Sequence, residues 1–298
     1  MTFSQPKVDV RVVKHFMGET IVPAHPQRVV VLLGSLLEPA FALGVKPIAA
    51  PKDAVSDLQR LVGKLRGIEL VDWPSPNLEK LLQLKPDLIL GFSSHEDIYP
   101  LLSHIAPTVL ATFNPVAPWK EFLAFTARAL GKTKEEQQLM ADYYARLAHL
   151  RASMGQHLLS TVVLSVAELR STELILAEKA SFAGTILLDA GIKIPPNQLL
   201  DPQTSIRLGG RAIVYPLSNE LLCEIDGNIL FLVTEDSVGD QDLNPAIKQF
   251  QPFPLWSKLK VVQLHRVHQV GFYWKGSGSI SANRAINDLF KYLLNSQF

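Results

Sequence analysis

The stretch VVVLLGSLLEPAFALG, residues 29–44, contains the pattern that decides the fold class. Its first five residues, 29–33, form a short apolar run with β-branched side chains, which predicts a strand buried on both faces. After a Gly-Ser turn, residues 36–43 predict an amphipathic helix, and Gly44 lies where a helix commonly ends in the left-handed conformation. The stretch therefore predicts one strand–loop–helix unit.

A second unit of the same kind follows in the first half of the chain. Residues 77–84 have helical spacing, the tripeptide KPD ends that helix, and residues 88–91 form another buried apolar run. Strands that alternate with helices are typical of a parallel sheet with helices on both faces.

The second half of the chain repeats this arrangement. EKLLQLKPDLIL at residues 79–90 aligns with ELLCEIDGNILF at residues 220–231, and apolar side chains coincide at six positions. Gly44 and Gly191 also end comparable helices rich in Leu and Ala, upstream of each segment. A duplicated α/β lobe is the simplest cause of this repetition. The period is too long for a solenoid repeat.

One long amphipathic helix is predicted between the halves, from Lys134 to His157. An apolar stripe at i, i+3, i+4 spacing defines it: Leu139, Met140, Tyr143, Tyr144, Leu147 and Leu150. We therefore expect an N-terminal lobe at 1–130, a connecting helix at 131–157 and a C-terminal lobe at 158–298. The expected fold class is α/β, with two Rossmann-like lobes whose central sheets are mostly parallel, joined by one long rigid helix. Residues 279–295 predict a final amphipathic helix.

Composition excludes several classes of protein. The 298 residues are 47% hydrophobic and 19% charged, with a net charge of +1, so we expect a compact protein that does not bind nucleic acid. The single cysteine, Cys223, excludes an internal disulfide. No apolar run is long enough to cross a membrane. Because the first residues lack an export signal, the protein is either cytosolic or its signal precedes Met1.

Catalytic and metal-binding motifs are not found. Gly276-Ser-Gly278 lacks the context of a nucleotide loop, and no hydrolase signature occurs. His265 lies inside the segment 259–267 and His268 follows it directly. The segment predicts a strand, in which a spacing of three would place the two histidines on opposite faces. In His95-Glu96-Asp97, a metal site is less favoured than two acidic residues in the first turn of a helix. We expect no catalytic residue and no metal site.

Aromatic and arginine side chains follow several predicted strands, where open α/β sheets bind ligands. Arginine can pair with carboxylates or metal-bound oxygens, and aromatic rings offer contact area at low entropic cost. For each residue alone, packing is at least as good an explanation, and the shared position is what favours ligand contact. These residues are Phe92, Trp119, Arg170, Phe182 and the run Tyr273-Trp274-Lys275.

Four stretches together resemble the class III periplasmic substrate-binding proteins of ABC importers, and most closely the iron-siderophore branch. They are residues 18–31, GETIVPAHPQRVVV; residues 38–47, EPAFALGVKP; residues 77–90; and residues 273–289, which contain YW and NRAINDL. The run from Ile206 to Ala212 and the pair Gly227-Asn228 depart from the usual pattern. These departures concern the identity of the ligand and not the fold.

The resemblance implies a ferric siderophore as ligand, of the hydroxamate or citrate type. The iron is already coordinated by the siderophore, so the protein needs no cofactor and no side chain that binds the metal directly. Glu79 and Glu220 match the glutamates that dock on a dimer of permease subunits, although a helix-start role would explain either one alone. The implied protein is a monomer, periplasmic or a cell-surface lipoprotein, with any lipid anchor outside this sequence. Candidate groove residues are Trp73, Phe92, Arg170, Arg207, Arg211, Trp274 and Arg284.

Other functions stay open at this point. A haem or cobalamin carrier would share the fold and would need a flatter groove. An α/β enzyme with its cleft between two lobes would need clustered cysteines or an acid/base pair. A scavenging protein without a permease is disfavoured because both glutamates are present.

Overall fold

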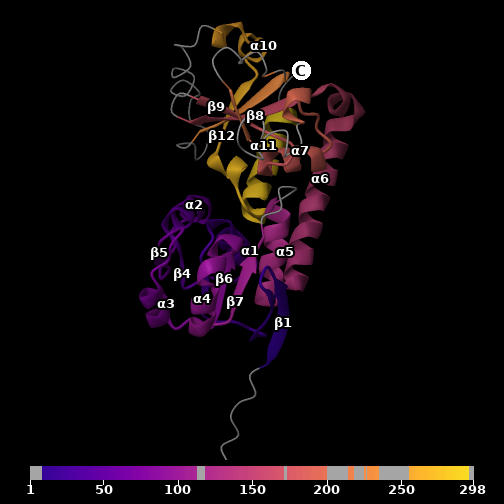
Figure 1. Ribbon diagram of the computed structural model, residues 1–298. Helices are drawn as coiled ribbons and strands as arrows, with labels where there is room; N and C mark the ends of the chain where they lie inside the picture. The colour runs from indigo at the N-terminus through magenta and orange to yellow at the C-terminus, as the bar shows by residue number, and fades with distance from the viewer. Residues whose placement is uncertain are drawn as a thin grey trace, which may run out of the picture. The chain divides into compact units, whose positions relative to one another are not determined.

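The computed structural model describes residues 9–112, 118–170, 173–199, 214–217, 225, 227–234 and 255–294 (Figure 1). These residues form two compact units, each with its own sheet. The first unit contains residues 9–112, 119–140 and 277–280, and the second contains the described residues from 141 to 276 and from 281 to 294. No helix in these ranges has the length and apolar character needed to cross a membrane.

The first unit is built on a five-stranded sheet in which every neighbouring pair is parallel. Its strand order is β5-β4-β3-β6-β7. The predicted strands at 29–33 and 88–91 are confirmed as β3 and β6, and both are fully buried apart from the last residue of β6. The strands are β3 (Val29–Val31), β4 (Ala49–Pro51), β5 (Glu69–Val71), β6 (Leu88–Phe92) and β7 (Thr108–Ala111).

Helices connect these strands, as the alternation of patterns predicted. Leu81 of α3 and Leu102 of α4 pack with Ile89 of β6 in one buried cluster, which shows why these helices carry an apolar stripe. Gly44 follows α1 with φ +79°, as expected for a glycine that ends a helix. The helical segments are η1 (Gly34–Leu36), α1 (Leu37–Ala42), α2 (Lys52–Val62), α3 (Leu78–Leu84), η2 (Ser93–Ile98), α4 (Tyr99–Ile105) and α5 (Pro118–Leu130).

The chain enters the first unit through an antiparallel hairpin, β1 (Val10–His15) and β2 (Gly18–Pro23). Its inner face buries Val13 and Val22, and the backbone N–H of Phe16 donates to the carbonyl of Leu110 in β7. The hairpin is therefore attached beside the parallel sheet.

The long helix α6 runs from Thr133 to Thr161 and passes from the first unit into the second. Its buried stripe includes Tyr143, Leu147 and Leu150, as predicted. The phenol of Tyr143 donates a 2.7 Å hydrogen bond to the carboxylate of Asp189 in α7. Gly155 has non-helical angles, φ 66° and ψ 169°, so the helical path is interrupted there.

The second unit contains a five-stranded sheet of order β10-β9-β8-β11-β12. β8, β11 and β12 are parallel, whereas β9 runs antiparallel to both of its neighbours. Gly191 follows α7 with φ +73°, so its role matches that of Gly44. The elements are β8 (Leu164–Arg170), β9 (Glu173–Ala177), α7 (Phe182–Asp189), η3 (Pro196–Gln198), β10 (Val214–Leu217), β11 (Ile229–Val233), η5 (Trp256–Lys258), α10 (Lys260–Gln263), β12 (Val267–Val270), η6 (Phe272–Lys275) and α11 (Ser279–Leu294).

The strand predicted at 259–267 is wrong. Residues 260–263 form the helical turn α10, and the strand begins only at Val267. Val261 and Val262 favour a strand by propensity, but Leu259 and Val261 are buried against the sheet as part of a helical connection. His265 lies in the turn between them, with a left-handed φ of 55°.

Candidate functional site

Aromatic side chains gather at the carboxyl ends of strands in the first unit. Phe92 is the last residue of β6, and Trp73 follows β5 by two residues. The Trp73 ring lies edge-on to the ring of His95, with centroids 5.3 Å apart and planes at 69°. Because β4 and β3 lie between β5 and β6, the loop carrying Trp73 must reach past both strands. It therefore places an aromatic surface over the end of the sheet where ligands of such folds bind.

His95 is the buried support of this surface, with 1% of its area exposed. Its ring folds back over Gly91, where a Cβ would lie 3.5 Å from His95 Nδ1 and only 2.7 Å from Leu110. The backbone N–H of Phe92 donates to His95 Nδ1 over 3.2 Å. Burial is the main cause of a lowered pKa for His95, so a neutral imidazole is favoured at pH 7.

Trp73 differs from the other tryptophans of the chain because it is 47% exposed. Trp119, Trp256 and Trp274 are each at most 3% exposed. An exposed indole standing on a buried histidine offers a large apolar face at little entropic cost. Phe92, three residues before His95, is half-buried, and its ring meets Phe122 of α5 edge-on at 6.4 Å.

Trp274 has a packing role in the second unit. Its indole N–H donates a 2.8 Å hydrogen bond to the carboxylate of Asp288 in α11, and its ring meets Phe231 of β11 at 5.2 Å. With 1% of its area exposed, it has little surface to offer a ligand. Its predicted ligand contact stays a prediction.

An ion pair lies at the carboxyl end of the sheet in the second unit. The ammonium of Lys275 donates a 2.6 Å hydrogen bond to Glu168, whose side chain is 8% exposed. The strand register places Glu168 opposite Val233 of β11, and Val233 opposite Val270 of β12. This pair therefore lies at the ends of three parallel strands, where a polar group of a ligand could take the place of one member of the pair.

The predicted arginines are only partly described. Arg284 is half-buried and its guanidinium lies 5.9 Å from the centre of the Tyr273 ring, which is a cation–π arrangement. Burial is the first cause of a raised pKa for Tyr273, so its phenol stays protonated at neutral pH. Arg170 is the last residue of β8, but its side chain lies outside the described residues, as do Arg207 and Arg211 entirely.

Glu79 is exposed in the first turn of α3. The helix is capped by Asn77, whose side-chain oxygen accepts from the backbone N–H of Lys80 over 3.1 Å. Beside Glu79, Leu82 is 61% exposed. A carboxylate next to an exposed leucine is accessible to a protein partner. Glu220 lies outside the described residues, so the pairing of the two glutamates stays a prediction.

Sequence reasoning missed two members of these clusters. His95 was considered only for metal binding, and its packing against Gly91 and Trp73 was not predicted. Glu96 lies in the first turn of η2, as predicted, whereas Asp97 lies beyond that turn, so the prediction was wrong for Asp97. Glu168 was missed because an acidic residue inside a strand was not considered as part of a ligand site. Among the described residues, no group of three His, Cys, Asp or Glu side chains could hold a metal.

Comparison with known proteins places this architecture in context. A family model described as "Periplasmic binding protein" matches residues 29–272. The chain is 32% identical to the "Probable siderophore-binding lipoprotein YfiY" of Bacillus subtilis, over 96% of this chain and 89% of that protein. It is 28% identical to the "Fe(3+)-citrate-binding protein YfmC" of the same organism, over 96% of this chain and 87% of that protein.

A solved structure supports the same relationship. The crystal structure of Staphylococcus aureus SirA complexed with staphyloferrin B is similar with a TM-score of 0.73 and 26% sequence identity. The match covers 95% of this chain and 98% of that one. The two-lobed fold is therefore shared across nearly the full length of both chains.

Proposed function

The chain belongs to the periplasmic binding protein family, and from this membership we propose that it captures a ferric siderophore and delivers it to an ABC importer. The observation that carries the proposal is the similarity to SirA, whose structure contains staphyloferrin B. Relatives named for siderophore and Fe(3+)-citrate binding support the same class of ligand. The iron is cargo, held by the siderophore's own oxygen atoms.

The structure supports this proposal through the exposed indole of Trp73. Its face can pack against the organic shell of a chelate, and its position over the strand ends of the first unit suits ligand contact. In the second unit, the pair of Glu168 and Lys275 and the cation of Arg284 supply polar groups for an anionic shell. We propose that Phe92 in the first unit, and Arg170, Arg207 and Arg211 in the second, supply further ligand contacts.

Delivery needs a docking surface in addition to a ligand site. We propose that Glu79 and Glu220 contact basic pockets of a permease dimer, one from each unit. Charged groups at such contacts act mainly on association rate and register. The protein acts as a monomer outside the cytoplasm, and the lipoprotein name of YfiY supports an anchored form. It performs no catalysis in this role.

A ligand panel tests the proposal. Ferric complexes of a hydroxamate, citrate and a catecholate are added to the protein, and tryptophan fluorescence and the melting temperature are recorded. We expect quenching and a raised melting temperature with at least one hydroxamate or citrate-type complex. If none of the three classes changes either signal, the siderophore function is wrong.

A further inference from the structure

The outer face of the β1–β2 hairpin is apolar and exposed. Val12 and Ile21 are cross-strand partners on this face, and Val10 lies on it opposite Pro23. Together with Phe16 and Met17 at the turn, these side chains form what we call the hairpin face. Their exposed fractions run from 41% for Met17 to 63% for Ile21.

This exposure is unusual for a hairpin that is already packed on one side. Val13 and Val22 point to the opposite face and are buried beside β7. A half-buried strand ordinarily alternates apolar residues inward with polar residues outward. Here both sides of β1 carry valines, so the outward ones are not needed for the core. Contiguous exposed apolar residues of this kind mark interaction surfaces.

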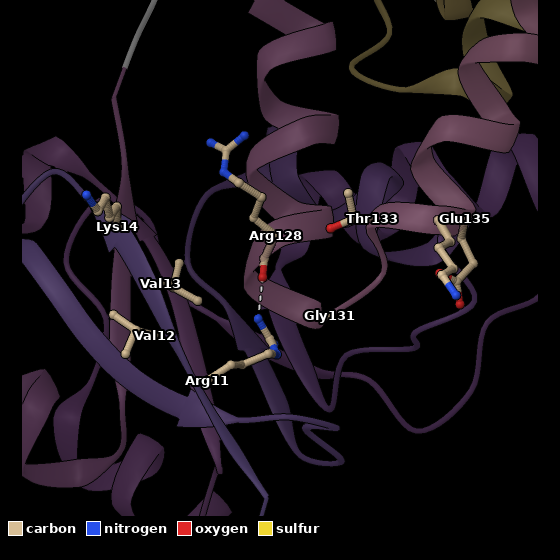
Figure 2. Close-up of a pocket in the computed structure, with 9 residues that line it drawn as sticks. Arg11, Val12, Val13, Lys14, Arg128, Gly131, Thr133 and Glu135 are labelled. Atoms are coloured by element: carbon tan, nitrogen blue, oxygen red, sulfur yellow. Dashed lines mark hydrogen bonds between the residues drawn. The ribbon is translucent and has the colours of Figure 1, made fainter.

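A basic pocket of about 860 Å³ adjoins the hairpin face along β1. Figure 2 shows it between β1 and the corner where α5 ends and α6 begins. Val12 and Lys14 line the pocket and also lie on the outer side of the hairpin, so the two features are continuous. The pocket has four cationic side chains and one carboxylate, namely Arg11, Lys14, Arg128, Lys134 and Glu135.

The charged side chains of this pocket differ in the contacts that they make. Arg11 donates to the backbone carbonyls of Arg128 and Ala129, so it caps the end of α5. Glu135 is paired with Lys132 over 2.7 Å, and Lys14 is paired with Glu19 over 3.4 Å. Figure 2 shows the guanidinium of Arg128 directed away from the carbonyl that Arg11 contacts. Within the described part of the chain, neither Arg128 nor Lys134 forms an ion pair.

We propose that the hairpin face and this basic pocket together dock on an anionic lipid bilayer. Apolar side chains such as Ile21 and Val12 suit the boundary between headgroups and acyl chains, while Lys134 and Arg128 suit the lipid phosphates. A small soluble anion would account for the cations and leave the apolar residues without a partner. The proposal concerns a surface contact of the folded protein and is independent of its siderophore.

The test measures binding of the protein to sedimented vesicles. One set contains phosphatidylcholine only, and the other contains about 30 mol % phosphatidylglycerol. We expect about fivefold more protein on the anionic vesicles, and a loss of most of this excess when salt is raised from about 50 mM to about 500 mM. Equal binding to both sets, or no binding to either, overturns the proposal.

Paired variants separate the two parts of the surface. The double variant Val12→Ser/Ile21→Ser, and separately Arg128→Gln/Lys134→Gln, should each lower anionic-vesicle binding at least about threefold. The matched controls are Leu82→Ser/Leu101→Ser, also exposed apolar residues of the first unit, and Lys52→Gln/Lys64→Gln. Unchanged binding by both test variants contradicts the proposal. Self-association in sedimentation that Val12→Ser/Ile21→Ser abolishes would assign the face to a second copy of the chain and also overturn it.

Discussion

The indole of Trp73 stands edge-on against the imidazole of His95, and the indole is half exposed while the imidazole is buried. The contact fixes an aromatic surface without covering it. Such preorganisation lowers the entropic cost of binding, because the ring does not have to be ordered by the ligand.

Replacing Trp73 with Ala should therefore weaken binding of the ferric complex at least fivefold, or about 1 kcal/mol, because a large apolar contact is lost. Isothermal titration checks this value. The matched control is Tyr144→Ala, which removes another exposed ring that stands edge-on to a buried one, Tyr143. If the Trp73 variant binds as tightly as the Tyr144 variant, Trp73 does not contact the ligand.

Acidification should destabilise the protein through His95. Burial lowers the pKa of His95 in the folded state below that of the unfolded chain, so the unfolded chain takes up protons first as the pH falls. The contribution of neutral His95 to the free energy of unfolding is therefore fully present above a pH of about 6.5. Below that pH it is lost, by up to about 1.4 kcal/mol per pH unit. Burial also lowers the pKa of His15 and His268, which adds to the same trend.

Melting temperatures between pH 7.5 and 5.5 test this prediction. The variant His95→Gln should show a smaller fall in melting temperature over this range than the unmodified protein, whatever its absolute stability. His104→Gln, at an exposed position, serves as the control. Identical pH slopes for all three proteins would contradict the assignment to His95.

The pair of Lys275 and Glu168 should contribute more to stability than an exposed pair. Changing Lys275 to Met leaves the nearly buried carboxylate of Glu168 without this partner, and the expected loss is about 1–3 kcal/mol in the free energy of unfolding. Lys14→Met breaks the exposed pair with Glu19, and the expected change is within about 0.5 kcal/mol. Urea unfolding of both variants gives the comparison, and equal losses would contradict the prediction.

Changing Glu79 and Glu220 together to Ala should leave the affinity for the ferric siderophore unchanged and abolish uptake. We expect the loss of uptake because the variant lacks the two carboxylates through which the protein docks on the permease. Uptake of radioactive iron by cells that carry the variant measures the effect, with Glu96→Ala/Glu121→Ala as a control at exposed positions. Normal uptake by the Glu79/Glu220 variant would remove the docking role from these residues.

The sequence predicted the fold where apolar runs and helical stripes were long. The strands at Val29 and Leu88, the helix stripe through Tyr143 and Leu147, and the final helix from Ser279 all appear in the structure. These patterns succeed because burial on one or both faces directly determines the spacing of apolar residues. The short connection at 260–263 was mistaken for a strand, since two adjacent valines carry no periodicity and tertiary packing decided their conformation.

The candidate site was harder to predict because its contacts join residues far apart in the chain. The Trp73 ring meets His95 only because the loop after β5 crosses two strands, and nothing in the local sequence specifies that path. Trp274 was a candidate groove residue through the family resemblance, and its hydrogen bond to Asp288 joins it to a residue of α11 that lies 14 positions further along the chain. Local patterns identified the strand ends and did not distinguish exposed aromatic rings from buried ones.

The most direct measurement is a calorimetric titration of the purified protein with one siderophore in its ferric and iron-free forms. The siderophore chosen is the one whose ferric complex raises the melting temperature of the protein most. We expect a single site with a dissociation constant of about 1 μM or tighter for the ferric complex. The iron-free siderophore should bind at least about tenfold more weakly, because iron coordination no longer fixes its conformation. Equal affinity for the two forms, or no heat with any ferric complex, would contradict the account.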